Sequence, residues 1–366
     1  MGDALRVGLV GAGQISGAYL STLPRLPGVV LTKVADLDSD RAVAAAARVP
    51  EAVAVTPDEL FAADDVDLVL NLTVPKAHAQ VALAAIAEGK HVYGEKPLAA
   101  DTGQAKALLN AAGQAGVRIG CAPDTVLGTG IQTARAALDA GEIGRPVAAT
   151  AFMTTPGHER WHPAPEFYYR SGGGPLLDMG PYYLTALVTL LGPVRRVVGM
   201  SAAPQKTRVI GSGARAGTRF PVEVDTHVTG VFEHADGVLC TLMMSFDVWQ
   251  ANLPRIEVYG THGSLSVPDP NGFDGTVAIS HPGRDGWTEL PKYGGYADAA
   301  RGFGLADMAR AIADGTAHRA NGELAYHVLD VMESLLVSAQ VGLAVDVAST
   351  CARPAPVPLG ARPDEA

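Results

Sequence analysis

The stretch LRVGLVGAGQISG at residues 5–17 decides the fold of this chain. Its first six residues form a short run that is apolar apart from Arg6, which is typical of a strand buried on both faces of a parallel sheet. The turn Gly11-Ala12-Gly13 follows, and a helix is expected over residues 14–23. A second predicted strand, 29–35, ends at Asp36. Strand, glycine turn, helix, strand and terminal acid are the context that a dinucleotide-binding site requires.

The physical reason lies in the turn. Glycines let the backbone approach a pyrophosphate, and the helix N-terminus offers unpaired N–H groups and a positive dipole end. Asp36 is expected to accept hydrogen bonds from the ribose hydroxyls and to repel a 2′-phosphate, which favours NAD over NADP. Ser16 stands where the fingerprint has a third glycine or alanine. The alternative is an ordinary glycine turn. The expected cofactor contacts in this part are Gly11, Ala12, Gly13, Gln14, Ile15 and Asp36.

Strands and helices continue to alternate after Asp36. Strands are expected at 67–72, 91–93 and 117–120, with helices at 76–88 and from about 102 to 114. In a doubly wound sheet, ligands lie outside the carboxyl ends of the strands. Further candidate cofactor contacts fall at or just after such ends: Thr73, Pro75, His78, Glu95 and Lys96.

Lys96 stands in the tripeptide Glu95-Lys96-Pro97, directly after a predicted strand. Pro97 biases Lys96 toward an extended backbone, so this turn has a defined conformation. Glu95 is the nearest counter-charge. We expect the ammonium group to lie beside the dinucleotide and act on a substrate hydroxyl or carbonyl; the alternative is a surface lysine in a turn.

The pattern changes after about residue 123. A helix at 128–140 leads into extended segments that predict one large antiparallel or mixed sheet, and helices return at 299–313 and 323–341. The fold class is therefore α/β: a doubly wound Rossmann domain at 1–122, an α+β substrate-binding and oligomerisation domain at 123–345, and a Pro/Ala-rich tail at 346–366 that is expected to be loosely ordered.

Composition limits the classes of partner. The 366 residues are 48% hydrophobic and 18% charged, with a formal net charge of −10. This charge argues against nucleic acid and against an anionic membrane. Three widely spaced cysteines give no disulfide or zinc pattern, so a reducing cytoplasm is expected. No apolar run approaches the roughly 20 residues of a membrane helix.

A glycine-rich segment at residues 171–174 precedes a helix expected to begin near Asp178. Asp178 and Tyr182 are four residues apart and so share one face of that helix. A carboxylate and a phenol in this arrangement can hold a polyol hydroxyl and relay its proton. The alternative is an acid that favours the helix dipole, with Tyr182 half-buried in the core.

The segment GHERWHP at residues 157–163 carries two histidines four apart, His158 and His162. Pro163 and the lack of an apolar stripe argue against a helix that would aim both at a metal, so no metal is expected. This loop is expected to line a substrate pocket, where Trp161 stacks on a sugar face and His162 binds a hydroxyl. His227 faces the same pocket or lies on the sheet.

These features together resemble the glucose–fructose oxidoreductase/inositol dehydrogenase/MocA family. The residues that carry the resemblance are the turn at 11–13, Asp36, Thr73-Val74-Pro75 with His78, Glu95-Lys96-Pro97, and 172–182. It covers the chain to about residue 345. The resemblance implies that Lys96 lies at the nicotinamide and works with Asp178, and it implies a homodimer or homotetramer formed through the large sheet.

The chain departs from the family pattern at two places. Tyr182 stands where inositol-dehydrogenase-like members have histidine, which is similar to the branch of glucose–fructose oxidoreductase and related sugar dehydrogenases. Cys121-Ala122-Pro123-Asp124 replaces a segment that contains an arginine in many relatives.

The resemblance implies hydride transfer between NAD and a secondary hydroxyl or ketone of a sugar, glycoside or cyclic polyol, with Lys96, Asp178 and Tyr182 as the catalytic residues. Tyr182 removes the hydroxyl proton, Lys96 holds the alkoxide and Asp178 positions the hydroxyls. Two alternatives stay open: redox-neutral glycoside cleavage through transient oxidation, and a non-catalytic dinucleotide-binding protein.

Overall fold

The structure is a computed structural model that describes residues 4–363, which divide into two units. The first unit comprises residues 4–132, 293–326 and 354–363, and the second comprises 133–292 and 327–353. The first unit thus includes two later segments that the sequence assigned to the second domain and to the tail. Each unit is described by itself.

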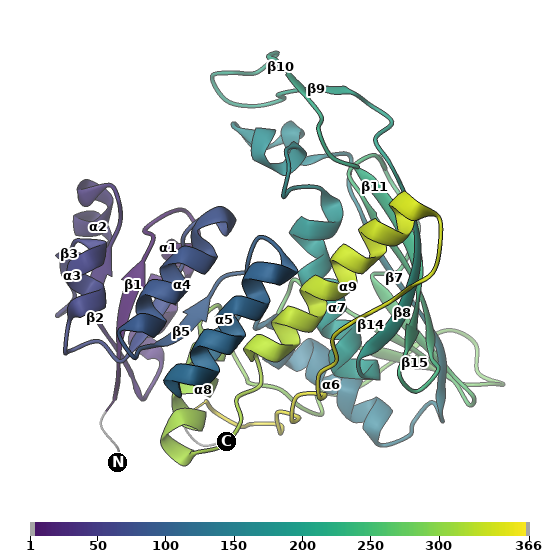
Figure 1. Cartoon of the computed structure of the whole chain (residues 1–366). Helices are drawn as coiled ribbons and strands as arrows, with labels where there is room; N and C mark the ends of the chain where they lie inside the picture. Colours follow the sequence, from purple (N-terminus) through teal and green to yellow (C-terminus); the bar gives the residue numbers. More distant parts are fainter. Residues whose placement is uncertain (1–3, 364–366) are drawn as a thin grey trace. The chain divides into compact units, whose positions relative to one another are not determined.

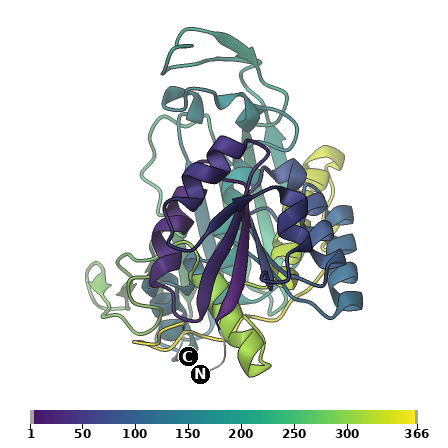
Figure 2. The same ribbon diagram turned by 90° about the vertical axis from the view of Figure 1, so that its left-hand side faces the viewer.

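The first unit contains a six-stranded parallel sheet in the order β3-β2-β1-β4-β5-β6. Its strands are β1 (Leu5–Val10), β2 (Val29–Ala35), β3 (Val53–Val55), β4 (Leu68–Asn71), β5 (His91–Gly94) and β6 (Ile119–Cys121). Its helices are α1 (Ser16–Thr22), α2 (Ser39–Ala46), α3 (Pro57–Ala62), α4 (His78–Ala87), α5 (Thr102–Ala115) and α8 (Phe303–Asp314). Helices lie on both sides of this sheet (Figure 2), so the predicted doubly wound arrangement is confirmed.

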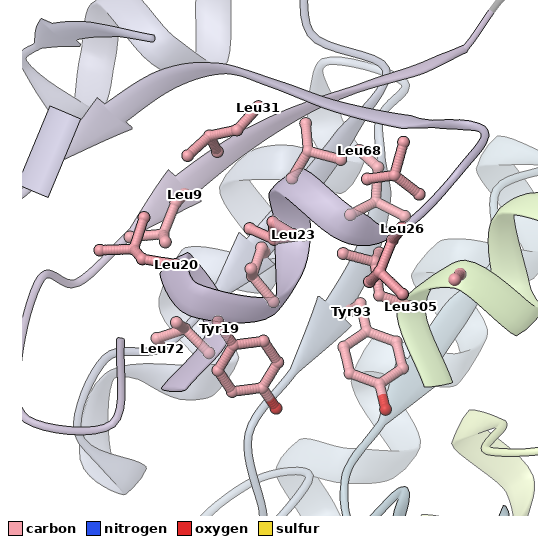
Figure 3. Packing of buried hydrophobic residues seen from close by; sticks show 14 of the residues in the cluster. Leu9, Tyr19, Leu20, Leu23, Leu26, Leu31, Leu68, Leu72, Tyr93 and Leu305 are labelled. Carbon is pink, nitrogen blue, oxygen red and sulfur yellow. The ribbon is translucent and has the colours of Figure 1, made fainter. Parts of the chain in front are cut away.

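The core of this unit joins distant parts of the chain (Figure 3). Leu9 of β1, Tyr19 and Leu20 of α1, and Tyr93 of β5 are buried there. Leu305 of α8 is fully buried in the same cluster, although it lies about 200 residues later in the sequence. Each fully buried leucine stabilises a fold by roughly 1.5–3 kcal/mol. Helix α8 is therefore an integral part of the first unit.

The second unit is built on a nine-stranded mixed sheet in the order β16-β15-β14-β13-β7-β12-β11-β8-β17. Its central strands β7 and β12 pair in parallel, and the other neighbours are antiparallel. The strands are β7 (Pro146–Thr154), β8 (Val194–Ala202), β11 (His227–His234), β12 (Leu239–Ser245), β13 (Ile256–Gly260), β14 (Ser264–Val267), β15 (Ala278–Ser280), β16 (Thr288–Glu289) and β17 (Val345–Asp346). A separate hairpin is formed by β9 (Thr207–Val209) and β10 (Arg219–Pro221).

Helices α7 (Pro175–Leu191) and α9 (Gly322–Val341) lie along one side of this sheet (Figure 1). Gly199 of β8 and Gly230 of β11 are directly paired, and a Cβ atom on either would lie 2.5 Å from Leu335 of α9. The paired glycines therefore give α9 room to approach. The division between the units falls within α9 and within α6 (Thr129–Asp139).

Two expectations need correction. Helix α7 begins at Pro175 rather than near Asp178, because proline fits the first turn of a helix, where its missing N–H is not needed. Within the described part of the tail, residues 354–363 belong to the first unit and are packed there rather than loosely ordered. Val357 is buried, and its N–H donates to Gln132 Oε1 at 2.8 Å. Within residues 4–363, no helix is long and apolar enough to span a bilayer.

Candidate active site

The glycine turn after β1 has the geometry that a dinucleotide needs. Gly11 has φ +99°, and a Cβ atom there would lie 2.7 Å from the carbonyl carbon of Leu72, so no other residue fits. Gly13, in contrast, has open space where its Cβ would be. Asp36 Oδ2 accepts a hydrogen bond of 2.7 Å from the Ala12 N–H, which places the acid at the end of β2 directly against the turn.

Ser16 fits the third small-residue position of the fingerprint and adds a hydrogen bond to the turn. It is buried, and its hydroxyl donates to the carbonyl oxygen of Gly13 at 2.6 Å. The hydroxyl therefore closes the turn at the beginning of α1. Gln14 and Ile15, which precede it, are exposed. The residues of this turn fit a bound dinucleotide, because the backbone at Gly13 is open and Asp36 stands beside it.

His78 ties together the two segments that follow β4 and β5. Its Nδ1 lies 2.6 Å from the carbonyl oxygen of Pro97, and its Nε2 lies 3.0 Å from that of Thr73. Burial lowers the pKa of His78, although these two carbonyl groups favour the protonated ring. The imidazole is almost wholly buried between the segments, so the structure gives it a positioning role. A direct contact with the cofactor stays a prediction.

Glu95 also faces the protein. Its carboxylate accepts hydrogen bonds from the Tyr19 hydroxyl at 2.8 Å and from the Lys96 N–H at 3.1 Å. Burial and the charge of Glu95 hold the pKa of Tyr19 well above its usual value, so the phenol stays a donor. Glu95 thereby links α1 to the backbone of Lys96. Lys96 itself is half-buried.

The segment that replaces the family's arginine carries a buried acid that the sequence reasoning missed. Asp124 is fully buried, and its Oδ2 accepts hydrogen bonds from the N–H groups of Gly302 and Gly304. Arg301 lies 3.6 Å from its Oδ1. Burial raises the pKa of Asp124, and Arg301 opposes that rise. Asp124 thus holds the beginning of α8, and its partners lie almost 180 residues away in the sequence.

In the second unit, Asp178 lies in the first turn of α7 and its N–H donates to the Gly174 carbonyl oxygen at 3.0 Å. The helix dipole favours a carboxylate at this end. Tyr182 follows one turn later on the same face and is largely buried. The structure therefore keeps the predicted pair on one helix.

Asp178 also contacts a residue that the sequence did not assign to it. Nε2 of His158 lies 3.0 Å from Asp178 Oδ2. The ring of His158 packs against both Tyr168 and Phe246, with ring centroids at 4.5 and 4.4 Å. His162 bonds elsewhere, since its Nδ1 accepts the Ala164 N–H at 3.1 Å. The two histidines therefore have different partners.

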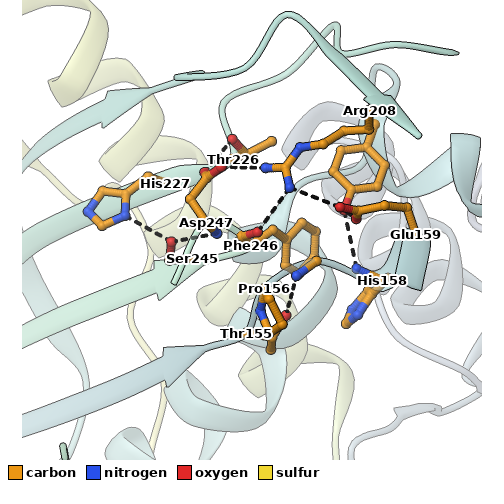
Figure 4. A network of polar contacts seen from close by, with 12 residues as sticks. Thr155, Pro156, His158, Glu159, Arg208, Thr226, His227, Ser245, Phe246 and Asp247 are labelled. Atoms are coloured by element: carbon orange, nitrogen blue, oxygen red, sulfur yellow. Dashed lines mark hydrogen bonds and ion pairs between the residues drawn. The ribbon is translucent and has the colours of Figure 1, made fainter. Parts of the chain in front are cut away.

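A buried polar network holds the loop that carries His158 (Figure 4). Arg208, from the β9–β10 hairpin, is almost fully buried; it pairs with Glu159 at 3.0 Å and also with Asp247. The Tyr169 hydroxyl donates to Glu159 and accepts the His158 N–H. These contacts join the 155–170 loop to the end of β12, and nothing in the local sequence indicates them.

The remaining predicted substrate contacts differ in exposure. Trp161 is 56% exposed and its ring lies 5.4 Å from that of His158, so an indole face is available beside the His158–Asp178 pair. His227 shares its face of β11 with Thr229 and Val231, opposite the buried face, and its Nδ1 lies 2.9 Å from Ser245 Oγ. His227 thus reaches the network of Figure 4 from the open side of the sheet.

Comparison with known proteins matches both halves of the chain. Residues 5–122 match the oxidoreductase family with an NAD-binding Rossmann fold, and residues 131–266 match the GFO/IDH/MocA C-terminal domain. A 1,5-anhydro-D-fructose reductase of Ensifer adhaerens is 30% identical over 267 residues, which cover 71% of this chain and 74% of that protein. The chain belongs to the Gfo/Idh/MocA oxidoreductase family. The predicted resemblance is thereby confirmed.

Other Gfo/Idh/MocA relatives span more of the chain. A D-xylose 1-dehydrogenase (NADP(+)) of Haloferax volcanii is 28% identical over 86% of this chain and 91% of its own length. The solved structure of a levoglucosan dehydrogenase, apo form, has a TM-score of 0.81 at 21% identity and covers 96% of this chain and 100% of that one, which shows the same fold. As a member of this family, the chain is an NAD(P)-dependent oxidoreductase that acts on CH–OH groups, with an NAD-binding first unit.

Proposed function

We propose that this Gfo/Idh/MocA enzyme transfers a hydride between NAD and a secondary carbinol of a sugar, glycoside or cyclic polyol. The observation that carries the proposal is the bracing of Lys96. The segment after β5 is fixed by Tyr19 through Glu95 and by His78 through Pro97. Such bracing suits an ammonium group that must meet a reacting oxygen in a defined place.

A bound nicotinamide would supply the hydride acceptor or donor. In oxidation, the substrate C–H bond gives up a hydride, the O–H bond gives up a proton, and a C=O bond forms. We assign to Lys96 the stabilisation of the developing alkoxide, to Tyr182 the contact through which the hydroxyl proton leaves, and to Asp178 the positioning of the hydroxyls. A free phenol has a pKa of about 10, so a cation must stabilise the phenolate if Tyr182 is to take up the hydroxyl proton near neutral pH.

NAD is proposed as the preferred cofactor. Asp36 presents a carboxylate at the end of β2, next to Ala12 of the glycine turn. A 2′-phosphate there would meet a negative charge, whereas ribose hydroxyls would find an acceptor. The relative in Haloferax volcanii is named for NADP(+), so the two cofactors must be compared directly in this enzyme.

A second copy of this chain is the proposed partner. The open face of the large sheet carries apolar side chains that the unit itself leaves exposed: Val198, Met200, Val231 and Leu239. Large exposed apolar patches are typical of subunit interfaces. A homodimer or homotetramer that buries this face fits the resemblance.

The test supplies NAD with a panel of sugars, glycosides and inositols and records NADH absorbance and product mass together. The proposal predicts one NADH for each molecule of ketone formed from at least one class of substrate. Glycoside cleavage without net NADH would replace it with the redox-neutral alternative. No turnover over the panel, by protein that binds NADH, would contradict it.

A further inference from the structure

The pair formed by His158 and Asp178 is the strongest unassigned chemical feature of the second unit. The two side chains come from segments 20 residues apart, and Nε2 lies 3.0 Å from Oδ2. Their side chains are 12% and 18% exposed, so the contact is largely shielded from water. A shielded acid–imidazole contact is the arrangement that enzymes use to orient a histidine and to stabilise its charged form.

The contact decides which ring nitrogen carries the proton. An ionised carboxylate only accepts hydrogen bonds, so Nε2 of His158 must be the donor. In the neutral ring, Nδ1 then keeps its lone pair and can accept a proton. Tyr168 and Phe246 both pack against the ring. The loop behind it is fixed by Glu159 and Arg208.

Other charges near the ring are already compensated. Glu159 is paired with Arg208. Burial raises the pKa of Tyr169, which donates to Glu159 and stays neutral. Tyr168 contacts His158 through its aromatic ring. Asp178 is therefore the charged group that faces His158 directly.

Position 182, one helical turn after Asp178 on the same face of α7, carries a phenol rather than an imidazole. A phenol is a poor final proton acceptor at neutral pH, since its ordinary pKa is near ~10, while an imidazole titrates near neutrality. The chain thus supplies an imidazole to the same aspartate from another segment.

We propose that the hydroxyl proton released during substrate oxidation ends on Nδ1 of His158, with Asp178 compensating the imidazolium charge. The inference rests on the proposed function. The balance is complete: the substrate C–H bond gives up a hydride, its O–H bond gives up a proton that ends on Nδ1 of His158, and a C=O bond forms. In the reverse direction, the imidazolium returns the proton to the alkoxide.

The test compares His158→Gln with wild type on the substrate found in the panel. Glutamine keeps an N–H donor for Asp178 but cannot take up the proton. We expect kcat/KM for oxidation at pH 7 to fall by roughly a hundredfold, and its decline on the acid side of the pH profile to disappear. His158→Ala should regain part of its rate with added imidazole. His262→Gln, an exposed histidine of the same unit, should behave as wild type.

Two results would overturn the inference. A His158→Gln enzyme with the wild-type acid limb and rate would show that His158 only positions Asp178, while the hydride-transfer function would stand. Nitrogen NMR of the wild-type ring provides a measurement that needs no substrate. A proton on Nδ1 instead of Nε2 at pH above 7 would contradict the inference even if the sugar panel itself failed.

Discussion

The hydroxyl of Tyr19 donates a buried hydrogen bond of 2.8 Å to the carboxylate of Glu95. Tyr19 lies in α1, the helix that follows the glycine turn, and Glu95 precedes Lys96. The segment that carries the lysine is thus bonded directly to the helix expected to receive the pyrophosphate. This hydrogen bond fixes the position of the Lys96 backbone relative to the glycine turn.

Substitution of Lys96 or Tyr182 should lower the turnover rate more than the affinity for the cofactor. Lys96→Ala and Tyr182→Phe are each expected to lower kcat by roughly a hundredfold or more, since both groups act on the reacting oxygen. The Kd for NADH, measured by fluorescence, should change by no more than a few-fold. Lys106→Ala, an exposed lysine on α5, serves as the control. Full turnover in either site variant would remove that residue from the mechanism.

Alanine substitutions at the two glycines of the turn should have different effects, one on cofactor binding and the other on stability. Gly13→Ala places a methyl group in space that the protein leaves open, so thermal stability should be that of wild type while NADH binds at least about tenfold more weakly. Gly11→Ala combines φ +99° with contacts below 3 Å to Leu72 and should cost about 2 kcal/mol or more in unfolding free energy. Equal effects of the two changes on NADH binding at equal stability would argue against a pyrophosphate at Gly13.

Cofactor preference should depend on the charge of Asp36. Asp36→Asn keeps an oxygen that can accept the Ala12 N–H but removes the repulsion of a 2′-phosphate. The ratio of kcat/KM for NAD over that for NADP should fall by about tenfold or more. Asp40→Asn, at an exposed position of α2, should leave the ratio unchanged. An unaltered ratio in Asp36→Asn would show that another residue selects the cofactor.

Assembly should depend on the open face of the large sheet. Met200 on β8 is 73% exposed within the unit, so Met200→Asp would bring a charge into the proposed interface. We expect the molar mass from light scattering to drop toward that of one chain. Val209→Asp on the separate hairpin should retain the wild-type mass. A Met200→Asp protein with unchanged mass would place the subunit contact elsewhere.

Acid should destabilise the second unit through His327. Burial lowers the pKa of this histidine from 6.5 to about 4. The unfolded chain therefore binds a proton between these values that the native state does not, so stability is fully present above pH 6.5 and falls as the pH drops toward 4. The loss reaches about 3 kcal/mol at most. Urea unfolding at pH 7 and pH 5 measures it, and His327→Gln should show a smaller difference. An equal difference in the variant would assign the effect to other groups.

The elements that organise the first unit were predictable because their signals are local. Apolar runs, the glycine turn and Asp36 lie within 32 residues, and parallel strands bring their carboxyl ends to one edge of the sheet. Strand β3 was missed, since its three residues are only partly buried and give little apolar signal. The beginning of α7 lies earlier than predicted because Pro175 occupies the first turn, where its missing N–H is not needed.

The contacts that hold the candidate-site residues join segments that are distant in the sequence. Glu95 meets Tyr19 across 76 residues, Arg208 meets Glu159 across 49, and His158 meets Asp178 across 20. Each depends on how separate elements pack, and periodicity carries no information about such pairs. The sequence therefore indicated Asp178, Lys96, Glu95 and His78 but not the pairings among distant residues that hold them in place.

The path of the chain has a consequence for synthesis. The first unit needs Leu305 for its core, and it needs Val357, whose N–H bonds to Gln132. During synthesis, the six strands of the Rossmann sheet are complete more than 150 residues before these segments are made. Until then, the apolar surface that Leu305 covers in the finished unit is expected to stay exposed. Separate expression of residues 1–122 would therefore yield an aggregation-prone fragment rather than a portable cofactor-binding domain.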